Sequence, residues 1–161
     1  MKRKLRSRRG FTLAETMIVI VILSLMTAAG IAGISNVMAS RVTMVRAADA
    51  DILGSTAFQA IADELRFGQD IKIAADGKSV ELDSVTYGTG ATLTLDSDGK
   101  LIFDSDGSQI LGAKAYSSGL KLQNLTFTAG SGVITVRFEV TANGGALATV
   151  ESTVTPLNAI A

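Results

Sequence analysis

The chain has 161 residues, with 15 basic and 15 acidic side chains, and contains neither cysteine nor histidine. Thiolate and imidazole metal sites are therefore excluded, as is any nucleophilic mechanism that needs a histidine base. The lack of cysteine also excludes disulfide bonds and leaves the redox compartment open.

The charges are unevenly distributed along the chain. Six basic residues lie within the first ten positions: Lys2, Arg3, Lys4, Arg6, Arg8 and Arg9. The remainder has nine basic and fifteen acidic residues, a net charge of −6, which argues against a generally basic surface that binds nucleic acid.

Residues 16–40 contain no charged side chain, and residues 17–26 are almost wholly Ile, Val, Leu and Met. An apolar run of about 20 residues is long enough to cross the hydrocarbon core of a bilayer. We therefore predict a membrane-embedded helix, with the basic leader on the cytoplasmic side.

Glu15 lies at the start of this apolar run. A carboxylate near the edge of the hydrocarbon region costs on the order of 2.5 kcal/mol or more unless it is paired. Cleavage between Gly10 and Phe11 would create an ammonium group at Phe11, four residues before Glu15 and on the same helix face. Processing would thus produce the cation that Glu15 needs.

The basic leader, Gly10, Phe11, Glu15 and the unbroken apolar helix together resemble the type III signal of type IV pilins and of the pseudopilins of type II secretion and DNA-uptake systems. The resemblance covers residues 1 to about 40. It implies that a prepilin peptidase cleaves after Gly10 and methylates the new amine of Phe11. It also implies that Glu15 pairs with the N-terminus of a neighbouring subunit during assembly.

Two alternatives fit the same N-terminus. Residues 7–11 match a twin-arginine export signal, with a small-residue cleavage site at residues 28–33. Glu15 and the strong hydrophobicity of the run argue against that interpretation. The other alternative is an ordinary signal anchor, in which Glu15 is tolerated at the interface and the leader follows the positive-inside rule.

Beyond the uncharged run, apolar residues continue at helical spacing. They are Met38, Val42, Val45, Ile52, Phe58, Ile61 and Leu65. We expect this stripe to be the helix face that packs against a sheet. Arg66 and Gly68 supply a basic last turn and a stop, so the predicted helix runs from Phe11 to about Phe67.

After Gly68 the apolar period changes from 3.6 to 2, which indicates strands. The expected strands lie near residues 71–73, 80–82, 92–95, 101–104, 120–128, 133–141 and 146–154, with a hairpin turn at Asp76 and Gly77. The apolar residues that alternate along 133–141 should face the helix.

The predicted fold is α+β, a long N-terminal helix packed on a C-terminal antiparallel β-meander that forms one sheet. The predicted parts are a cleaved leader at 1–10, a transmembrane and assembly half of the helix at 11–39, and an outer globular domain at 40–161.

Two Asp-Ser-Asp-Gly turns suggest a calcium site, because hard oxygen ligands suit that ion. Their acidic residues are Asp96, Asp98, Asp104 and Asp106. The spacing does not match an EF-hand loop, and Asp-Gly is also common hairpin-turn chemistry. We favour plain turns and expect no cofactor.

The sequence indicates a structural filament subunit and not an enzyme, because no set of nucleophile, base and oxyanion donors converges. The resemblance implies a single-pass inner-membrane precursor, with its outer domain outside the cytoplasm, that later enters a pilus or pseudopilus. Implied partners are other pilin or pseudopilin subunits, a prepilin peptidase, the inner-membrane assembly platform and, before assembly, lipid.

Residues 63–66, 70–73 and 125–127 are loosely similar to minor pseudopilins of the J type. The alternative function is a membrane-anchored binding module that recognises a ligand through loops such as residues 113–119, or a protein exported by the twin-arginine or Sec route.

Overall fold

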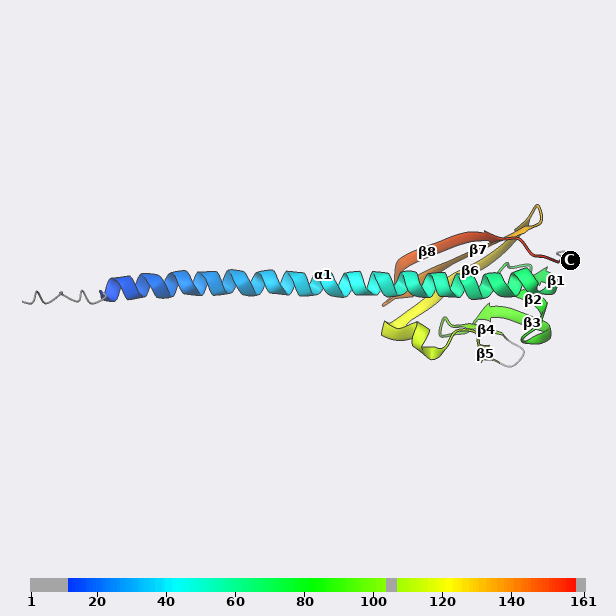
Figure 1. Ribbon diagram of the computed structural model, residues 1–161, viewed down its shortest axis with the longest axis horizontal. Helices are drawn as coiled ribbons and strands as arrows, with labels where there is room; N and C mark the ends of the chain where they lie inside the picture. The colour runs from blue at the N-terminus through cyan, green and yellow to red at the C-terminus, as the bar shows by residue number, and fades with distance from the viewer. Residues whose placement is uncertain (1–11, 104–106, 159–161) are drawn as a thin grey trace, which may run out of the picture. The chain divides into compact units, whose positions relative to one another are not determined.

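The computed structural model describes residues 12–103 and 107–158. They form the helix α1 (Leu13–Phe67), the 3-10 helix η1 (Ala113–Gly119) and eight strands (Figure 1). The strands are β1 (Gln69–Ile73), β2 (Val80–Ser84), β3 (Gly88–Leu95), β4 (Leu101–Phe103), β5 (Ser108–Gln109), β6 (Leu120–Gly130), β7 (Val133–Ala142) and β8 (Gly145–Val154). The chain divides into two compact units, residues 1–43 and 44–161.

The α+β class and the long N-terminal helix are confirmed, and α1 ends at Phe67 as predicted. The expectation of a single sheet is wrong. Strands β1 to β5 form one antiparallel sheet in sequence order, and β6, β7 and β8 form a second antiparallel sheet. The break falls where β5 stops after two residues and η1 carries the chain to the start of β6.

Two glycine turns of the first sheet join it to β6, the edge strand of the second. The Phe127 N–H donates to the Gly77 carbonyl (2.7 Å), and the Leu122 N–H donates to the Gly99 carbonyl (2.8 Å). Gly99 has a φ of +75°, and a Cβ atom there would lie 2.6 Å from the Leu122 carbonyl oxygen. Glycine is therefore required at this turn, where the chain must approach β6 closely.

The core of the outer unit lies between α1 and the two sheets. The helix buries Ala50, Leu53, Gly54, Ala57, Ile61, Ala62 and Leu65. On β7, the alternating apolar side chains from Ile134 to Val140 are buried, which confirms the predicted face. Ile61 and Leu65 confirm the last part of the predicted helix stripe, and Phe58 is partly buried.

The first part of that stripe was assigned to the wrong face. Val45 and Ile52 are 58% and 63% exposed, and Met38 and Val42 are exposed as well. At Gly54 the helix lies too close to β8 for a large side chain, since a Cβ atom there would be 2.9 Å from Cγ2 of Val150. Close packing selects small residues at such a contact, so a stripe of large apolar residues does not mark the buried face of the helix.

The C-terminal segment of the chain caps the last turn of α1. The Leu157 N–H donates to the Arg66 carbonyl (3.0 Å), and Nδ2 of Asn158 donates to the Gly68 carbonyl (2.9 Å). These bonds satisfy carbonyl groups that have no partner inside the helix. The end of α1 is therefore held by residues some 90 positions later in the sequence.

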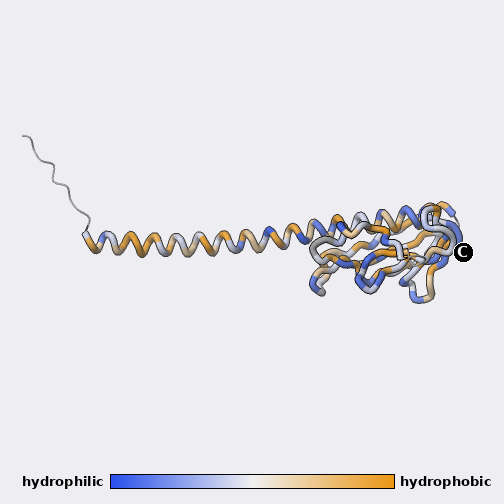
Figure 2. The backbone as a smooth tube through the Cα atoms, turned by 90° about the horizontal axis from the view of Figure 1, so that it is seen from below, coloured by the Kyte–Doolittle hydropathy of each residue, from blue (hydrophilic) through white to orange (hydrophobic). Residues whose placement is uncertain are grey.

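The helix in the first unit has no protein partner among the described residues. Its large apolar side chains from Leu13 to Met38 are 52–83% exposed, and Figure 2 shows hydrophobic residues recurring all along this segment. By length and composition, the same helix is long and apolar enough to cross a membrane. Such a surface requires lipid or other helices to cover it.

We predict that Gly54→Leu destabilises the outer unit by about 1–3 kcal/mol, because the new side chain overpacks the contact with Val150. The loss should appear even though Leu forms helices better than Gly does. Ala48→Leu, on an exposed position of the same helix, should change the free energy of unfolding by less than about 0.5 kcal/mol. Urea unfolding of a fragment that starts at Ser40 measures both, and equal effects would show that the helix face is misplaced.

Candidate functional site

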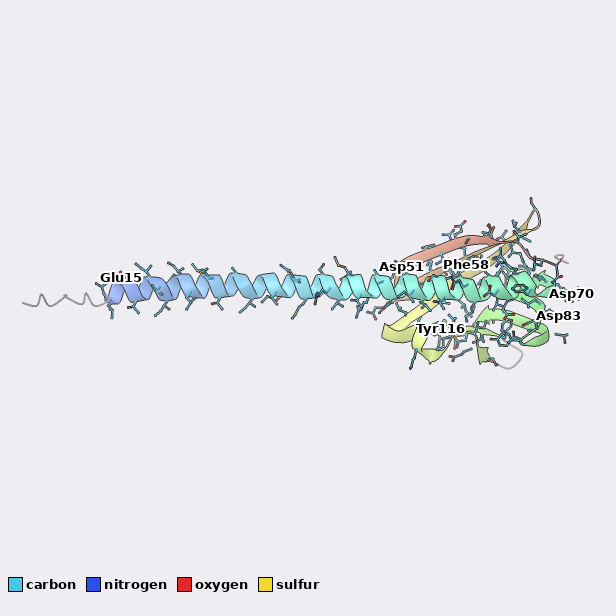
Figure 3. The ribbon with its side chains drawn as sticks, in the orientation of Figure 1. Glu15, Asp51, Phe58, Asp70, Asp83 and Tyr116 are labelled. Carbon is cyan, nitrogen blue, oxygen red and sulfur yellow. The ribbon has the colours of Figure 1, made fainter. Side chains whose placement is uncertain are left out.

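The candidate site begins at the N-terminus of α1, where Thr12 and Glu15 bond to each other. The Glu15 N–H donates to Oγ1 of Thr12 (3.2 Å). In return, the backbone N–H and the hydroxyl of Thr12 donate to Oε2 of Glu15, at 3.4 and 3.5 Å. Figure 3 shows Glu15 in this first turn. The arrangement is a capping box, in which side chains satisfy N–H groups that the helix leaves free.

This capping box gives Glu15 a local partner in addition to the cation that cleavage is expected to produce. Its carboxylate accepts two hydrogen bonds from Thr12 and lies at the positive end of the helix dipole. The interaction with Thr12 was not predicted, although a Thr followed three residues later by Glu before an apolar run is a recognised sequence signal. Glu15 can thus be held in a defined position before a cation reaches it.

Gly10 and Phe11 lie outside the described residues, so the position of the Phe11 amine relative to Glu15 stays a prediction. The capping box lies one residue beyond Phe11 in the sequence. Cleavage after Gly10 would therefore leave the N-terminal ammonium directly before the residue that binds Glu15.

The hydroxyl groups inside the apolar run bond to the helix itself. Ser24 donates to the Val21 carbonyl (2.7 Å), and Thr27 donates to the Leu23 carbonyl (2.8 Å). Ser35 makes the equivalent bond one turn back. Hydrocarbon offers no competing partners, so internally satisfied hydroxyl groups make this helix suitable for a bilayer or for a bundle of helices.

The aspartates considered for calcium are only partly described. Oδ1 of Asp96 accepts the N–H groups of Asp98 (2.9 Å) and Lys100 (2.8 Å), which is the chemistry of a turn. Asp104 and Asp106 lie outside the described residues. Within the described ranges, no group of three or more Asp and Glu side chains is placed to hold a metal ion.

Residues 113–119, considered as a ligand-binding loop, form η1, and Tyr116 anchors it. The Tyr116 hydroxyl accepts the Leu101 N–H at 2.8 Å. Burial raises the pKa of this phenol above its usual value, a nearby Asp96 charge adds to the rise, and the bond from Leu101 opposes it. Tyr116 therefore holds η1 against β4.

Comparison with family models decides what the N-terminus is. Residues 5–31 match the prokaryotic N-terminal methylation motif. This N-terminus is a prepilin-type signal. The matched range contains Gly10, Phe11, Thr12 and Glu15 and ends inside the apolar part of α1. Curated proteins and solved structures give no match to the chain.

The prepilin-type signal implies processing by a prepilin peptidase and favours this origin over a twin-arginine signal or an ordinary signal anchor. It accounts for the basic leader, the apolar helix and the acidic residue between them as parts of one motif. The match covers residues 5–31, at the start of the chain.

We predict that Tyr116→Phe lowers the free energy of unfolding by about 1–3 kcal/mol at pH 8, because it leaves the Leu101 N–H without its acceptor. The folded state raises the Tyr116 pKa above 10.0, so wild-type stability should be full below pH 10 and fall as the pH rises towards the raised value. This alkaline loss should be smaller in Tyr116→Phe. Urea unfolding at pH 8 and above pH 10 tests both effects, and wild-type behaviour at both would contradict the assigned contact.

Proposed function

We propose that the chain is a structural subunit of a type IV pilus or pseudopilus, assembled through α1 into a helical filament. The observation that carries the proposal is the prepilin-type signal at residues 5–31. Proteins with this motif are structural and not enzymatic, which agrees with the lack of histidine and cysteine in the chain. The exposed apolar side chains of residues 13–38 supply the surface that such assembly buries.

Before assembly, the apolar half of α1 spans the inner membrane, with the leader in the cytoplasm and residues 40–161 outside. The peptidase cleaves between Gly10 and Phe11 and methylates the Phe11 amine. Residues 11–39 then leave the lipid and pack against the same segment of neighbouring subunits. Lipid and neighbouring helices are similarly apolar, so close van der Waals contact and paired polar groups make the exchange favourable.

Glu15 gives this packing its register. In a docked pair, the carboxylate of one subunit meets the N-terminal ammonium of its neighbour, where both charges are shielded from water. A subunit out of step would leave these charges buried and unpaired, which costs several kcal/mol. The capping box supports the role, because bonds to Thr12 hold the carboxylate at the helix start.

The position of the subunit within the filament is a finer proposal. The loose similarity of residues 63–66, 70–73 and 125–127 to J-type pseudopilins favours a minor subunit. A minor and a major subunit alike would require the assembly platform and other pilin subunits as partners.

The test separates the charge of Glu15 from its capping role. Gln also forms a capping box, so Glu15→Gln keeps the helix start and removes only the charge. Thr12→Ala keeps the charge and removes the cap. We expect both variants to be cleaved, with a mature chain that starts at Phe11. We expect Glu15→Gln to lose about 3 kcal/mol in docking, which weakens docking by roughly 150-fold and should reduce filament incorporation strongly.

Thr12→Ala should have the milder defect, because losing an N-cap costs about 1 kcal/mol. Glu15→Asp is the matched control that keeps the charge on a shorter side chain. Each variant is coexpressed with the assembly machinery, and processed membrane pools are compared with sheared filaments by intact mass. Normal incorporation of Glu15→Gln would show that the charge has no role in assembly. A mature chain that starts near Gly30 would contradict prepilin processing.

A further inference from the structure

Three large apolar side chains gather on the surface at the C-terminal end of α1. Phe67, Val85 and Leu157 are 55%, 89% and 70% exposed. Phe67 and Val85 line one cleft of about 500 Å³, and the Leu157 N–H bonds to the residue before Phe67. We call Phe67, Val85 and Leu157 the distal patch. Exposed apolar groups with a polar rim are typical of interaction surfaces.

The distal patch is held in place by hydrogen bonds. Val85 lies in the turn between β2 and β3, where Oγ of Ser84 accepts the N–H groups of Thr86 and Tyr87 (both 3.0 Å) and donates to Glu64 (2.8 Å). The bonds from Leu157 and Asn158 to the helix end hold the third segment. Exposed turns favour Gly, Asn, Asp and Ser, so a nearly fully exposed Val at a fixed turn calls for a functional explanation.

Several carboxylates lie near the distal patch. Asp63 lines the same cleft as Phe67 and Val85, and Figure 3 shows Asp70 and Asp83 at this end of the outer unit. The basic side chain in the last helical turn is Arg66. A partner for this surface should therefore be apolar and basic.

The chain contains a segment with those properties. Residues 41–46 read Arg-Val-Thr-Met-Val-Arg, and Val42, Met44 and Val45 are 53%, 68% and 58% exposed. Within the described ranges, it is the one six-residue segment in which two arginines flank large exposed apolar side chains. We call it the basic segment.

We propose that the distal patch of one copy docks on the basic segment of a second copy. Apolar side chains meet apolar side chains, and Asp63 lies opposite an arginine, so charge and hydrophobicity both match. The two surfaces differ, so the contact is heterologous and repeats without closing, as a filament requires. Residues 44 and 67 are separated by 23 helical positions, so parallel copies joined in this way are displaced by about 35 Å along α1.

This inference rests on the proposed function and deepens it. A chain with complementary surfaces at residues 41–46 and at the end of α1 can repeat along a filament.

The absence of cysteine allows a direct test by disulfide cross-linking. The full chain with Val45→Cys and Val85→Cys is coexpressed with the assembly machinery, and sheared filaments are mildly oxidised. We expect a ladder of covalent multimers on a non-reducing gel. Either substitution alone should give no dimer, and a mixture of the two single variants should give dimers. Gln59→Cys with Val85→Cys is the matched control, because Gln59 is exposed on the same helix about 21 Å from Val45 and should give no ladder.

A second measurement tests the same contact if the cysteine variants are incorporated poorly into filaments. Arg46→Asp and Asp63→Arg should each reduce filament incorporation several-fold, and the double variant should restore it. Filaments that contain both cysteines without a ladder, an equal ladder from the Gln59→Cys control, or charge variants without rescue would overturn the docking. A wild-type chain missing from filaments would instead overturn the proposed function.

Discussion

The uncharged run at residues 16–40 has to be kept out of water, and the described part of the chain provides nothing to cover it. The first half of α1 is exposed apolar surface with its hydroxyl groups bonded internally, whereas one face of the second half is buried against the sheets. One continuous helix thus meets two different requirements. This division is what the proposed function requires, since either lipid or neighbouring helices can cover the first half.

The outer unit depends on close approach of backbone segments. Gly54 lets the helix reach β7 and β8, and Gly99 lets a turn of the first sheet reach β6. The C-terminal segment then returns to cap the end of α1. The Ser84–Glu64 bond ties the turn at Val85 to the helix, and the bonds from Leu157 and Asn158 tie the C-terminal segment to the helix end. The distal patch is therefore a fixed surface formed by three parts of the sequence.

Most of the fold could be predicted because it follows from local patterns. The change of period after Gly68 gave the end of the helix, and Asp-Gly pairs with alternating apolar residues gave most of the strands. The buried face of the helix and the division of the strands into sheets were not predictable from such local patterns. Ile52 looked like a core residue because it is large and apolar, yet Ala50, Gly54 and Ala57 fill the contact because the helix and the sheet lie so close. The division into two sheets follows from the short β5 and from η1, which leave no periodic signal in the sequence.

The candidate site was predictable in chemistry and only partly in geometry. Glu15 was identified because a carboxylate beside an apolar run needs an explanation, and the matched N-terminal motif contains it. Its bonds to Thr12 were not predicted, although the spacing of Thr12 and Glu15 is that of a capping box. Calcium at Asp96 was considered because acidic turns and ion sites share residue types, whereas the carboxylate oxygen binds its own turn.

Accessibility of a spin label at Leu23→Cys tests most directly the claim that the first half of α1 passes from lipid to neighbouring helices. In membranes, the label should collide readily with oxygen, which partitions into lipid, and little with a water-soluble nickel chelate. In sheared filaments it should be immobilised and reached poorly by both. A label at Gln59→Cys, on the exposed face of the outer unit, should stay accessible to the chelate throughout. Ready access of the chelate to the Leu23→Cys label in membranes, or an unchanged label environment in filaments, would contradict the account.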